Sequence, residues 1–231
     1  MRLLRIEEQG DFSLVEYTSE NVPRYAILSH RWGSDADEAT FKDVLENTGK
    51  SKPGYIKILK CTQQAARDGY KYVWVDTCCI DKTSSAELSE AINSMWNWYR
   101  NSAICYAFLN DVPASDEGAA NETAFAKSAW FTRGWTLQEL LAPMKLVFYD
   151  ESWSAIGTRN KLCAAINNIT GIGVEYFQGK PIRSASVAAR MSWASKRVTK
   201  RTEDLAYCLL GVFDVNMPLL YGEGSKAFRR L

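Results

Sequence analysis

The stretch YAILSHRWG, residues 25–33, sets the architecture of this chain. Its first half is a short run of aliphatic and aromatic side chains, which is typical of a buried strand. Ser29, His30, Arg31 and Trp32 follow at once and end the run. In open α/β sheets, ligands bind beyond the carboxyl ends of the strands, so these four residues mark a candidate binding edge.

Three later runs of similar composition predict further strands: YVWVDT (72–77), ICYAFL (104–109) and KLVFY (145–149). Helical patterns lie between them, over roughly 54–68 and 85–100 and around Trp135. The second of these begins with the capping-box spelling Ser84-x-x-Glu87. The alternation of strands and helices favours an α/β fold, in which helices flank a mostly parallel sheet.

After about residue 150 the sequence predicts mainly helices, over 159–169, 184–195 and 203–213. Thr202 precedes Glu203 and Asp204, which suits an N-cap followed by acidic residues in the first helical turn. We expect a single domain over 1–231, with a sheet-containing core at about 24–150 and a helical C-terminal elaboration at about 151–231. The last residues, AFRRL, lie in a predicted helix, so we expect the chain to be part of a longer protein.

Composition and charge argue against several classes of protein. The chain has 231 residues and a formal net charge of +1, which gives no argument for nucleic acid or an anionic membrane as partner. No apolar run approaches the ~18 residues of a membrane span, and the N-terminus lacks the apolar segment of a signal peptide. The 6 cysteines include no CxxC pair, so we expect no metal site. Their positions in apolar runs indicate reduced thiols and a cytoplasmic location.

Common catalytic motifs are missing from the sequence. It contains neither a GxxxxGK[ST] phosphate loop nor a GxSxG nucleophile elbow. One nucleophilic arrangement stays open, because His30 ends the first predicted strand and Cys78 and Cys79 follow the second. Asp76 or Asp81 would then orient the imidazole. We favour the alternative that the two cysteines are small buried hydrophobic residues.

Four blocks of the sequence resemble, in order, the successive blocks of the fungal heterokaryon-incompatibility (HET) domain. They are YAILSHRWG, YVWVDTCCIDK, FTRGWTLQELLAP with LVFYDESW, and RTEDLAYCLLGVFDVNMPLLYGEG. The resemblance runs from about residue 24 to the end of the chain. It implies an effector that triggers cell death when incompatible fungal strains fuse. In that family the domain is usually the N-terminal part of a longer protein, often followed by a nucleotide-binding oligomerisation module.

A remoter resemblance, to Toll/interleukin-1 receptor (TIR) domains, bears on mechanism. SHRWG after one strand, VD after the next, and S-x-W followed by W-x-x-x-E-L are similar to the TIR series. TIR domains have a flavodoxin-like fold, and many cleave NAD⁺ with the glutamate of that last motif, which falls on Glu139 here. Trp130 and the Arg133-Gly134 insertion depart from the TIR pattern. The resemblance implies NAD⁺ as substrate, no further cofactor, and activity that requires self-association.

Glu139 permits two interpretations. In the first, Thr136 and Glu139 spell T-x-x-E and form a capping box at the start of a helix. In the second, the carboxylate stabilises the ribosyl cation that forms when neutral nicotinamide leaves, a step that needs no general acid. Helical spacing puts Glu139 and Trp135 on one face, turned away from the leucines of the segment. Spacing alone favours the capping box, and the resemblance favours catalysis.

The remaining candidate residues are expected to bind substrate around Glu139, with no metal. They are His30, Arg31, Trp32, Asp76, Asp81, Arg133 and Trp135. Arg31 and Arg133 suit phosphate groups, Trp32 suits a base, and the two aspartates suit ribose hydroxyls. Each also has a structural interpretation, which we favour for Asp81 as a turn residue. The basic run from Lys196 to Arg201 suits either a pyrophosphate or a solvated face, and we favour the second.

We therefore predict a cytoplasmic cell-death effector that self-associates and hydrolyses NAD⁺ or a related nucleotide. The alternative is a non-enzymatic interaction module that signals death by assembly, and a cysteine-dependent hydrolase ranks third. An attached nucleotide-binding oligomerisation module is the expected covalent partner. We expect neither nucleic acid nor a membrane to be bound.

Overall fold

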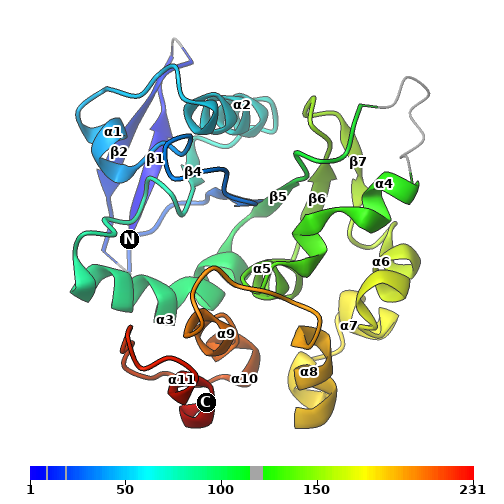
Figure 1. Ribbon diagram of the computed structural model, residues 1–231. Coiled ribbons are helices and arrows are strands. Elements are labelled where there is room, and N and C mark those ends of the chain that lie inside the picture. Colours follow the sequence, from blue (N-terminus) through cyan, green and yellow to red (C-terminus); the bar gives the residue numbers. More distant parts are fainter. Residues whose placement is uncertain (9, 19, 115–121) are drawn as a thin grey trace.

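The computed structural model describes residues 1–8, 10–18, 20–114 and 122–231. In this part of the chain, seven strands form one sheet in the order β2-β1-β4-β3-β5-β6-β7. The central strands run parallel to one another and match the four predicted runs: β3 (Ala26–His30), β4 (Tyr72–Trp74), β5 (Ile104–Phe108) and β6 (Leu146–Tyr149). The predicted α/β fold, with helices on both faces of a mostly parallel sheet, is confirmed (Figure 1).

Three outer strands were not predicted. β1 (Arg2–Ile6) and β2 (Phe12–Glu16) form an antiparallel hairpin beside β4, and β7 (Ala155–Thr158) pairs antiparallel with β6. Each of the three carries exposed or half-buried side chains. They therefore lack the continuous apolar run that identifies a strand buried on both faces.

The predicted helices connect the parallel strands. α2 (Pro53–Arg67) joins β3 to β4 after the short α1 (Phe41–Leu45), and α3 (Ser85–Asn101) joins β4 to β5. Between β5 and β6 lie α4 (Glu122–Lys127), the 3-10 turn η1 (Ala129–Thr132) and α5 (Thr136–Leu141). Figure 1 shows α2 on one side of the central strands and α3 with α5 on the other.

The N-terminus of α3 confirms half of its predicted capping box. The Ser84 side chain accepts a hydrogen bond from the Glu87 backbone N–H. The Glu87 carboxylate, however, accepts from the Asp81 N–H at 2.8 Å, and it also pairs with Arg2 of β1. Glu87 therefore links the loop after β4 to the β1–β2 hairpin, and its side chain does not complete the capping box of α3.

The C-terminal part is mainly helical, as predicted. Its elements are α6 (Cys163–Thr170), α7 (Val174–Phe177), η2 (Ile182–Ser184), α8 (Val187–Ala194), α9 (Asp204–Tyr207), α10 (Leu210–Phe213) and α11 (Lys226–Arg230). The predicted Thr202 N-cap is wrong, because α9 has Glu203 at its N-cap and makes no side-chain cap. Thr202 already lies within a turn, since its carbonyl accepts from the Leu205 N–H.

One hydrophobic core joins the sheet to the C-terminal helices. It contains Trp74, Trp130 and Phe148 together with Ile166 and Trp193. A smaller cluster packs α3 against α9, α10 and α11. No helix in the described ranges is long and apolar enough to cross a membrane.

The FTRGW segment is bound directly to the C-terminal part. The Gly134 N–H donates to the Val198 carbonyl at 2.8 Å, and the Val198 N–H donates to the Thr132 carbonyl at 2.7 Å. A Cβ atom on Gly134 would lie 2.5 Å from Thr199 Cγ2 and 3.1 Å from Cys208 Sγ. Glycine is therefore required here because the two segments approach so closely.

We expect Gly134→Ala to lower the free energy of unfolding by about 1–3 kcal/mol through overpacking. We also expect it to increase amide hydrogen exchange between residues 198 and 208, because the junction loosens. Gly69→Ala is the control for the exchange measurement: its φ of +80° makes alanine destabilising there too, but no atom lies within 4 Å of an added Cβ, so exchange at 198–208 should keep the wild-type rate. Urea denaturation and hydrogen exchange measure the two effects. An unchanged exchange rate at 198–208 in Gly134→Ala would contradict this account of the junction.

Candidate functional site

Two adjoining pockets lie at the carboxyl edge of the parallel strands. The inner pocket has a volume of about 170 Å³, and the outer pocket has a volume of about 330 Å³. Both are lined by Trp32, Arg133, Trp135, Lys200 and Asp204. This is the edge at which α/β sheets bind ligands, so the two pockets form the candidate site.

The structure brings most of the predicted site residues together. Trp32, Asp76, Arg133, Trp135 and Glu139 all line the inner pocket. Arg31 lines the outer pocket. The two exceptions are His30, which is buried behind Asp76, and Asp81, which lies outside both pockets.

Glu139 is a buried carboxyl group in the wall of the inner pocket, with 5% of its surface exposed. It accepts a hydrogen bond from the Ser29 hydroxyl, and the Trp130 indole N–H donates to the same hydroxyl at 2.9 Å. Burial raises the pKa of Glu139 to about 8, and the negative charge of Asp76 adds to the rise. Glu139 is therefore mostly protonated at neutral pH.

The capping-box interpretation of Glu139 is wrong. Thr136 is the first residue of α5 and not its N-cap, which is Trp135 and makes no side-chain cap hydrogen bond. The buried Thr136 hydroxyl donates to the Trp130 carbonyl at 2.5 Å instead. Because the helix begins one residue earlier than a box requires, the Glu139 side chain turns away from the helix start and toward Ser29.

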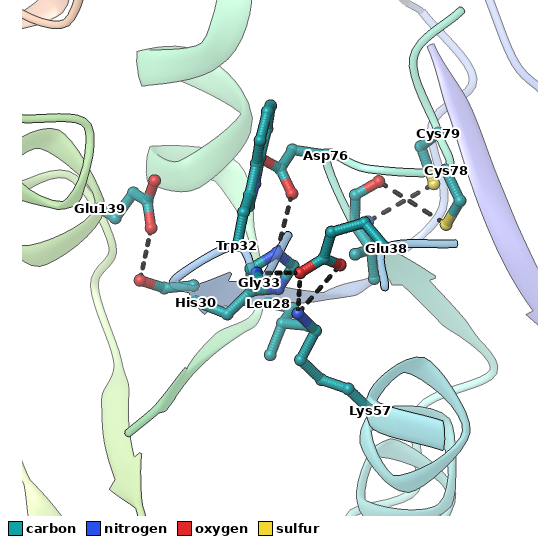
Figure 2. A network of polar contacts seen from close by, with 12 residues as sticks. Leu28, His30, Trp32, Gly33, Glu38, Lys57, Asp76, Cys78, Cys79 and Glu139 are labelled. Atoms are coloured by element: carbon teal, nitrogen blue, oxygen red, sulfur yellow. Dashed lines mark hydrogen bonds and ion pairs between the residues drawn. The ribbon is translucent and has the colours of Figure 1, made fainter. Parts of the chain in front are cut away.

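Asp76 and Trp32 form the wall on the other side of the pocket. The Trp32 Nε1–H donates to Asp76 Oδ2 at 2.8 Å, and His30 Nε2 lies 3.4 Å from Asp76 Oδ1 (Figure 2). Burial lowers the pKa of His30 well below its usual value, and nearby cationic side chains lower it further. His30 is therefore neutral, so its contact with Asp76 is not an ion pair.

A buried ion pair that the sequence analysis missed holds the loop carrying Trp32. Glu38 accepts from the Gly33 N–H at 2.6 Å and from Lys57 Nζ of α2 at 2.7 Å (Figure 2). The side chains of Lys57 and Glu38 are only 10% and 8% exposed. Removing one partner of such a pair leaves a buried charge, which is strongly destabilising. The pair therefore fixes Trp32 relative to the sheet.

The C-terminal part supplies the remaining wall. The Asp204 carboxylate accepts from the Tyr221 hydroxyl at 2.9 Å and from the Trp135 Nε1–H at 3.4 Å. Burial raises the pKa of Asp204. Arg201 also borders the inner pocket, and its guanidinium lies 4.5 Å from the centroid of the Tyr221 ring. Sequence analysis missed Asp204 and Tyr221 because nothing in their local sequence places them near the strand ends.

The basic run from Lys196 to Arg201 divides between two roles. Lys196, Lys200 and Arg201 are exposed, as the favoured prediction of a solvated face requires, and Lys200 and Arg201 also border the inner pocket. Arg197 is buried and donates to the Arg133 carbonyl at 2.8 Å and to the Thr136 hydroxyl at 2.9 Å. It therefore binds the C-terminal part to the start of α5.

Asp81 and the two cysteines are structural. Asp81 Oδ1 accepts from the Thr83 N–H at 2.9 Å, which forms the turn that we favoured. Cys78 donates to the Val75 carbonyl, and Cys79 accepts from the Val75 N–H. Burial raises the pKa of Cys78 well above its usual value, and neither thiol lines the pocket. The arrangement does not support a cysteine-dependent hydrolase.

Comparison with known proteins identifies the family. Residues 25–124 match the profile described as heterokaryon incompatibility protein (HET). The chain is also 49% identical, over 237 aligned residues, to the vegetative incompatibility protein HET-E-1 of Podospora anserina. The chain belongs to the HET family.

The alignment with the Podospora protein covers 100% of this HET domain but only 18% of that protein. The relative is therefore a much longer protein in which the HET region is one part. No solved structure matches the HET domain significantly. Among the residues that the structure describes, no group of three or more His, Cys, Asp or Glu side chains is placed to hold a metal ion.

The raised pKa of Glu139 predicts a pH-dependent stability. Its pKa rises from 4.5 to about 8 on folding, so the native state keeps a proton that the unfolded state has lost. The free energy of unfolding must then fall as the pH rises through this interval. His30 has the opposite effect, since its pKa is lowered from 6.5, but that effect is complete above about pH 6.5.

We expect the wild-type domain to lose roughly 1–2 kcal/mol of stability between about pH 6.5 and 8, at about 1.4 kcal/mol per pKa unit. Glu139→Gln should remove this loss, because the amide does not titrate. Asp81→Asn serves as the control and should keep the wild-type slope. Urea denaturation at several pH values measures it, and an unchanged slope in Glu139→Gln would refute a raised Glu139 pKa.

Proposed function

We propose that this HET domain acts in heterokaryon incompatibility as a cytoplasmic cell-death effector that hydrolyses the nicotinamide–ribose bond of NAD⁺ or a related nucleotide. The name of the Podospora relative supports the biological role. The observation that carries the chemistry is Glu139, a buried carboxyl group with a pKa of about 8 in the wall of a pocket. Such strongly shifted groups in clefts are typical of functional sites.

The proposed reaction breaks the bond between ribose C1′ and the ring nitrogen of nicotinamide. The electron pair of that bond goes to the pyridinium ring, which leaves as neutral nicotinamide. A water molecule then forms a bond to C1′ and releases a proton to solvent. Only the ribosyl cation between these steps needs help from the protein, and an ionised carboxylate in a water-poor pocket provides it.

Within the inner pocket, the interacting carboxyl groups of Glu139 and Asp76 suit a cationic ring, although the rest of the ionisable lining is mainly basic. A pyridinium ring bound beside Glu139 favours loss of the carboxyl proton, because an opposite charge lowers the pKa of an acid. Trp135 provides an aromatic side chain in the same pocket, and aromatic faces attract cations. One carboxylate oxygen of Asp76 accepts a hydrogen bond from the Trp32 indole, and the carboxylate can also accept hydrogen bonds from ribose hydroxyls.

Surface composition supports the second candidate function, a non-enzymatic module that signals by assembly. Six large apolar side chains among the described residues of the C-terminal part are exposed: Val187 by 58%, Val198 by 65%, Leu205 by 38%, Val215 by 37%, Leu220 by 52% and Phe228 by 45%. Side chains of this kind favour protein–protein contacts where they gather into one patch. Self-association is compatible with both candidates, and an attached oligomerisation module in a longer protein would promote it.

The decisive experiment uses artificially clustered HET domain incubated with NAD⁺, with nicotinamide release followed by chromatography. We expect Glu139→Gln to reduce the rate by about 100-fold or more, as removal of a transition-state stabiliser does. Wild-type kcat/KM should rise with pH and level off above about 8, because the ionised carboxylate is the active form. Asp81→Asn and Cys78→Ser are controls that should keep the wild-type rate.

The same variants expressed in cells separate the two candidate functions. Loss of both NAD⁺ cleavage and cell death in folded Glu139→Gln supports hydrolysis. Death that persists while cellular NAD⁺ stays constant supports assembly without catalysis. Circular dichroism of each variant confirms that the fold is kept.

A further inference from the structure

The inner pocket carries more positive charge than its residue types suggest. Its ionisable lining residues are the cations Lys82, Arg133, Lys200 and Arg201 and the acids Asp76, Glu139 and Asp204. Burial raises the pKa of Glu139 to about 8 and also raises that of Asp204. Glu139 is therefore mostly uncharged at neutral pH, so basic groups outnumber charged acids in this lining, whereas the chain as a whole has a net charge of only +1.

Lys82 and Arg133 are positioned on the same tryptophan, and the attraction of Asp76 for Lys82 is not a direct ion pair. Lys82 Nζ lies 3.7 Å, and the Arg133 guanidinium carbon 5.0 Å, from the centroid of the Trp32 ring. In the described ranges, neither side chain has a carboxylate oxygen within the 4.0 Å of an ion pair. By contrast, Lys200 pairs with Asp35, and Arg31 pairs with Asp111. Two unpaired cations held on one ring make a site for an anion.

The outer pocket continues this charge away from Glu139. Arg31 joins Arg133 and Lys200 in its lining, and Asp204 is its one acid among the described residues. Phosphate oxygens are the ligands that such groups of arginine and lysine bind best. Lys82 lines only the inner pocket and Arg133 lines both, so a pyrophosphate bound to the two would span the boundary between the pockets.

A third pocket extends the cleft further. It has a volume of about 350 Å³ and shares Arg31 and Gly33 with the outer pocket. Its lining includes Asn110 and the stacked pair Phe108 and Trp153, whose ring centroids lie 4.9 Å apart. Shared lining residues thus connect the three pockets in a row. The inner pocket contains Glu139, the outer pocket is lined by cations, and the third pocket is lined by Phe108 and Trp153.

We infer that the ligand of this cleft is a dinucleotide, whose pyrophosphate binds Lys82 and Arg133 beside Trp32. The ribosyl end lies at Glu139, and the second nucleoside lies in the third pocket. The orientation of the ligand rests on the proposed function, whereas the anion site rests on the unpaired cations alone. Neither a free nucleoside nor a mononucleotide would fill this cleft or neutralise its charge.

Binding of ADP-ribose tests the inference without any need for catalysis. We expect Lys82→Gln and Arg133→Gln each to weaken binding by about tenfold or more, because each loses a charge-assisted contact. Lys42→Gln is the matched control, since Lys42 is 77% exposed and lies on α1, and it should bind like the wild type. Inorganic pyrophosphate should compete with ADP-ribose for the wild-type protein. Adenosine, which has no phosphate, should bind Lys82→Gln and the wild-type protein with the same affinity. Calorimetry measures all of these affinities.

The outcomes separate this inference from the proposed function. If NAD⁺ is not cleaved but the two variants lose ADP-ribose affinity, the hydrolase is wrong and the pyrophosphate site stands. If NAD⁺ is cleaved with unchanged KM in both variants, or nicotinamide riboside is cleaved as efficiently as NAD⁺, the pyrophosphate site is wrong. Wild-type protein that fails to bind ADP-ribose also overturns it.

Discussion

A buried carboxyl group needs a hydrogen-bond partner, and the one that Glu139 finds on β3 organises the whole site. Ser29 of β3 donates to Glu139 and accepts from the Trp130 indole. Glu139 and Trp130 both lie in the segment between β5 and β6, so this segment is bound to β3 through one serine. That contact sets α5 against the strand whose continuation carries Trp32. Trp32 in turn donates to Asp76, which follows β4. Ser29 and Trp32 thus fix the segments that follow β3, β4 and β5 relative to one another.

The C-terminal part completes the site and does more than cover the sheet. Arg197 is buried, and burial lowers its pKa to about 10, yet it stays charged and donates to Arg133 and Thr136. A buried guanidinium without partners would be costly, so these bonds specify one docking position. That position brings Lys200, Arg201 and Asp204 to the pocket. The complete lining of the cleft therefore requires both parts of the domain to be packed together.

Local sequence predicted what depends on local physics. The four parallel strands are apolar runs, and α2 and α3 have clear periodicity, so their places were predictable. Most of the site was also predictable, because polar residues after parallel strands converge at one edge. The Glu38–Lys57 pair and the Tyr221–Asp204 bond were not, since each joins segments that no motif connects. The capping box failed for another reason: a shift of one residue in a helix start changes the role of every side chain near it.

Charge is distributed along the cleft in the same order as along the proposed ligand. Glu139 and Asp76 line only the inner pocket, which also contains Lys82 and Arg201, and the cations Arg133, Lys200 and Arg31 line the outer pocket. A dinucleotide with a pyridinium ring has its positive charge at one end and its negative charges in the middle. The complementary arrangement selects one orientation, because reversal would place phosphates against the carboxyl groups. In the proposed orientation the pyridinium ring adds a positive charge beside Glu139, which favours loss of the carboxyl proton. The proposed substrate would thus help to create the carboxylate that its own cleavage needs.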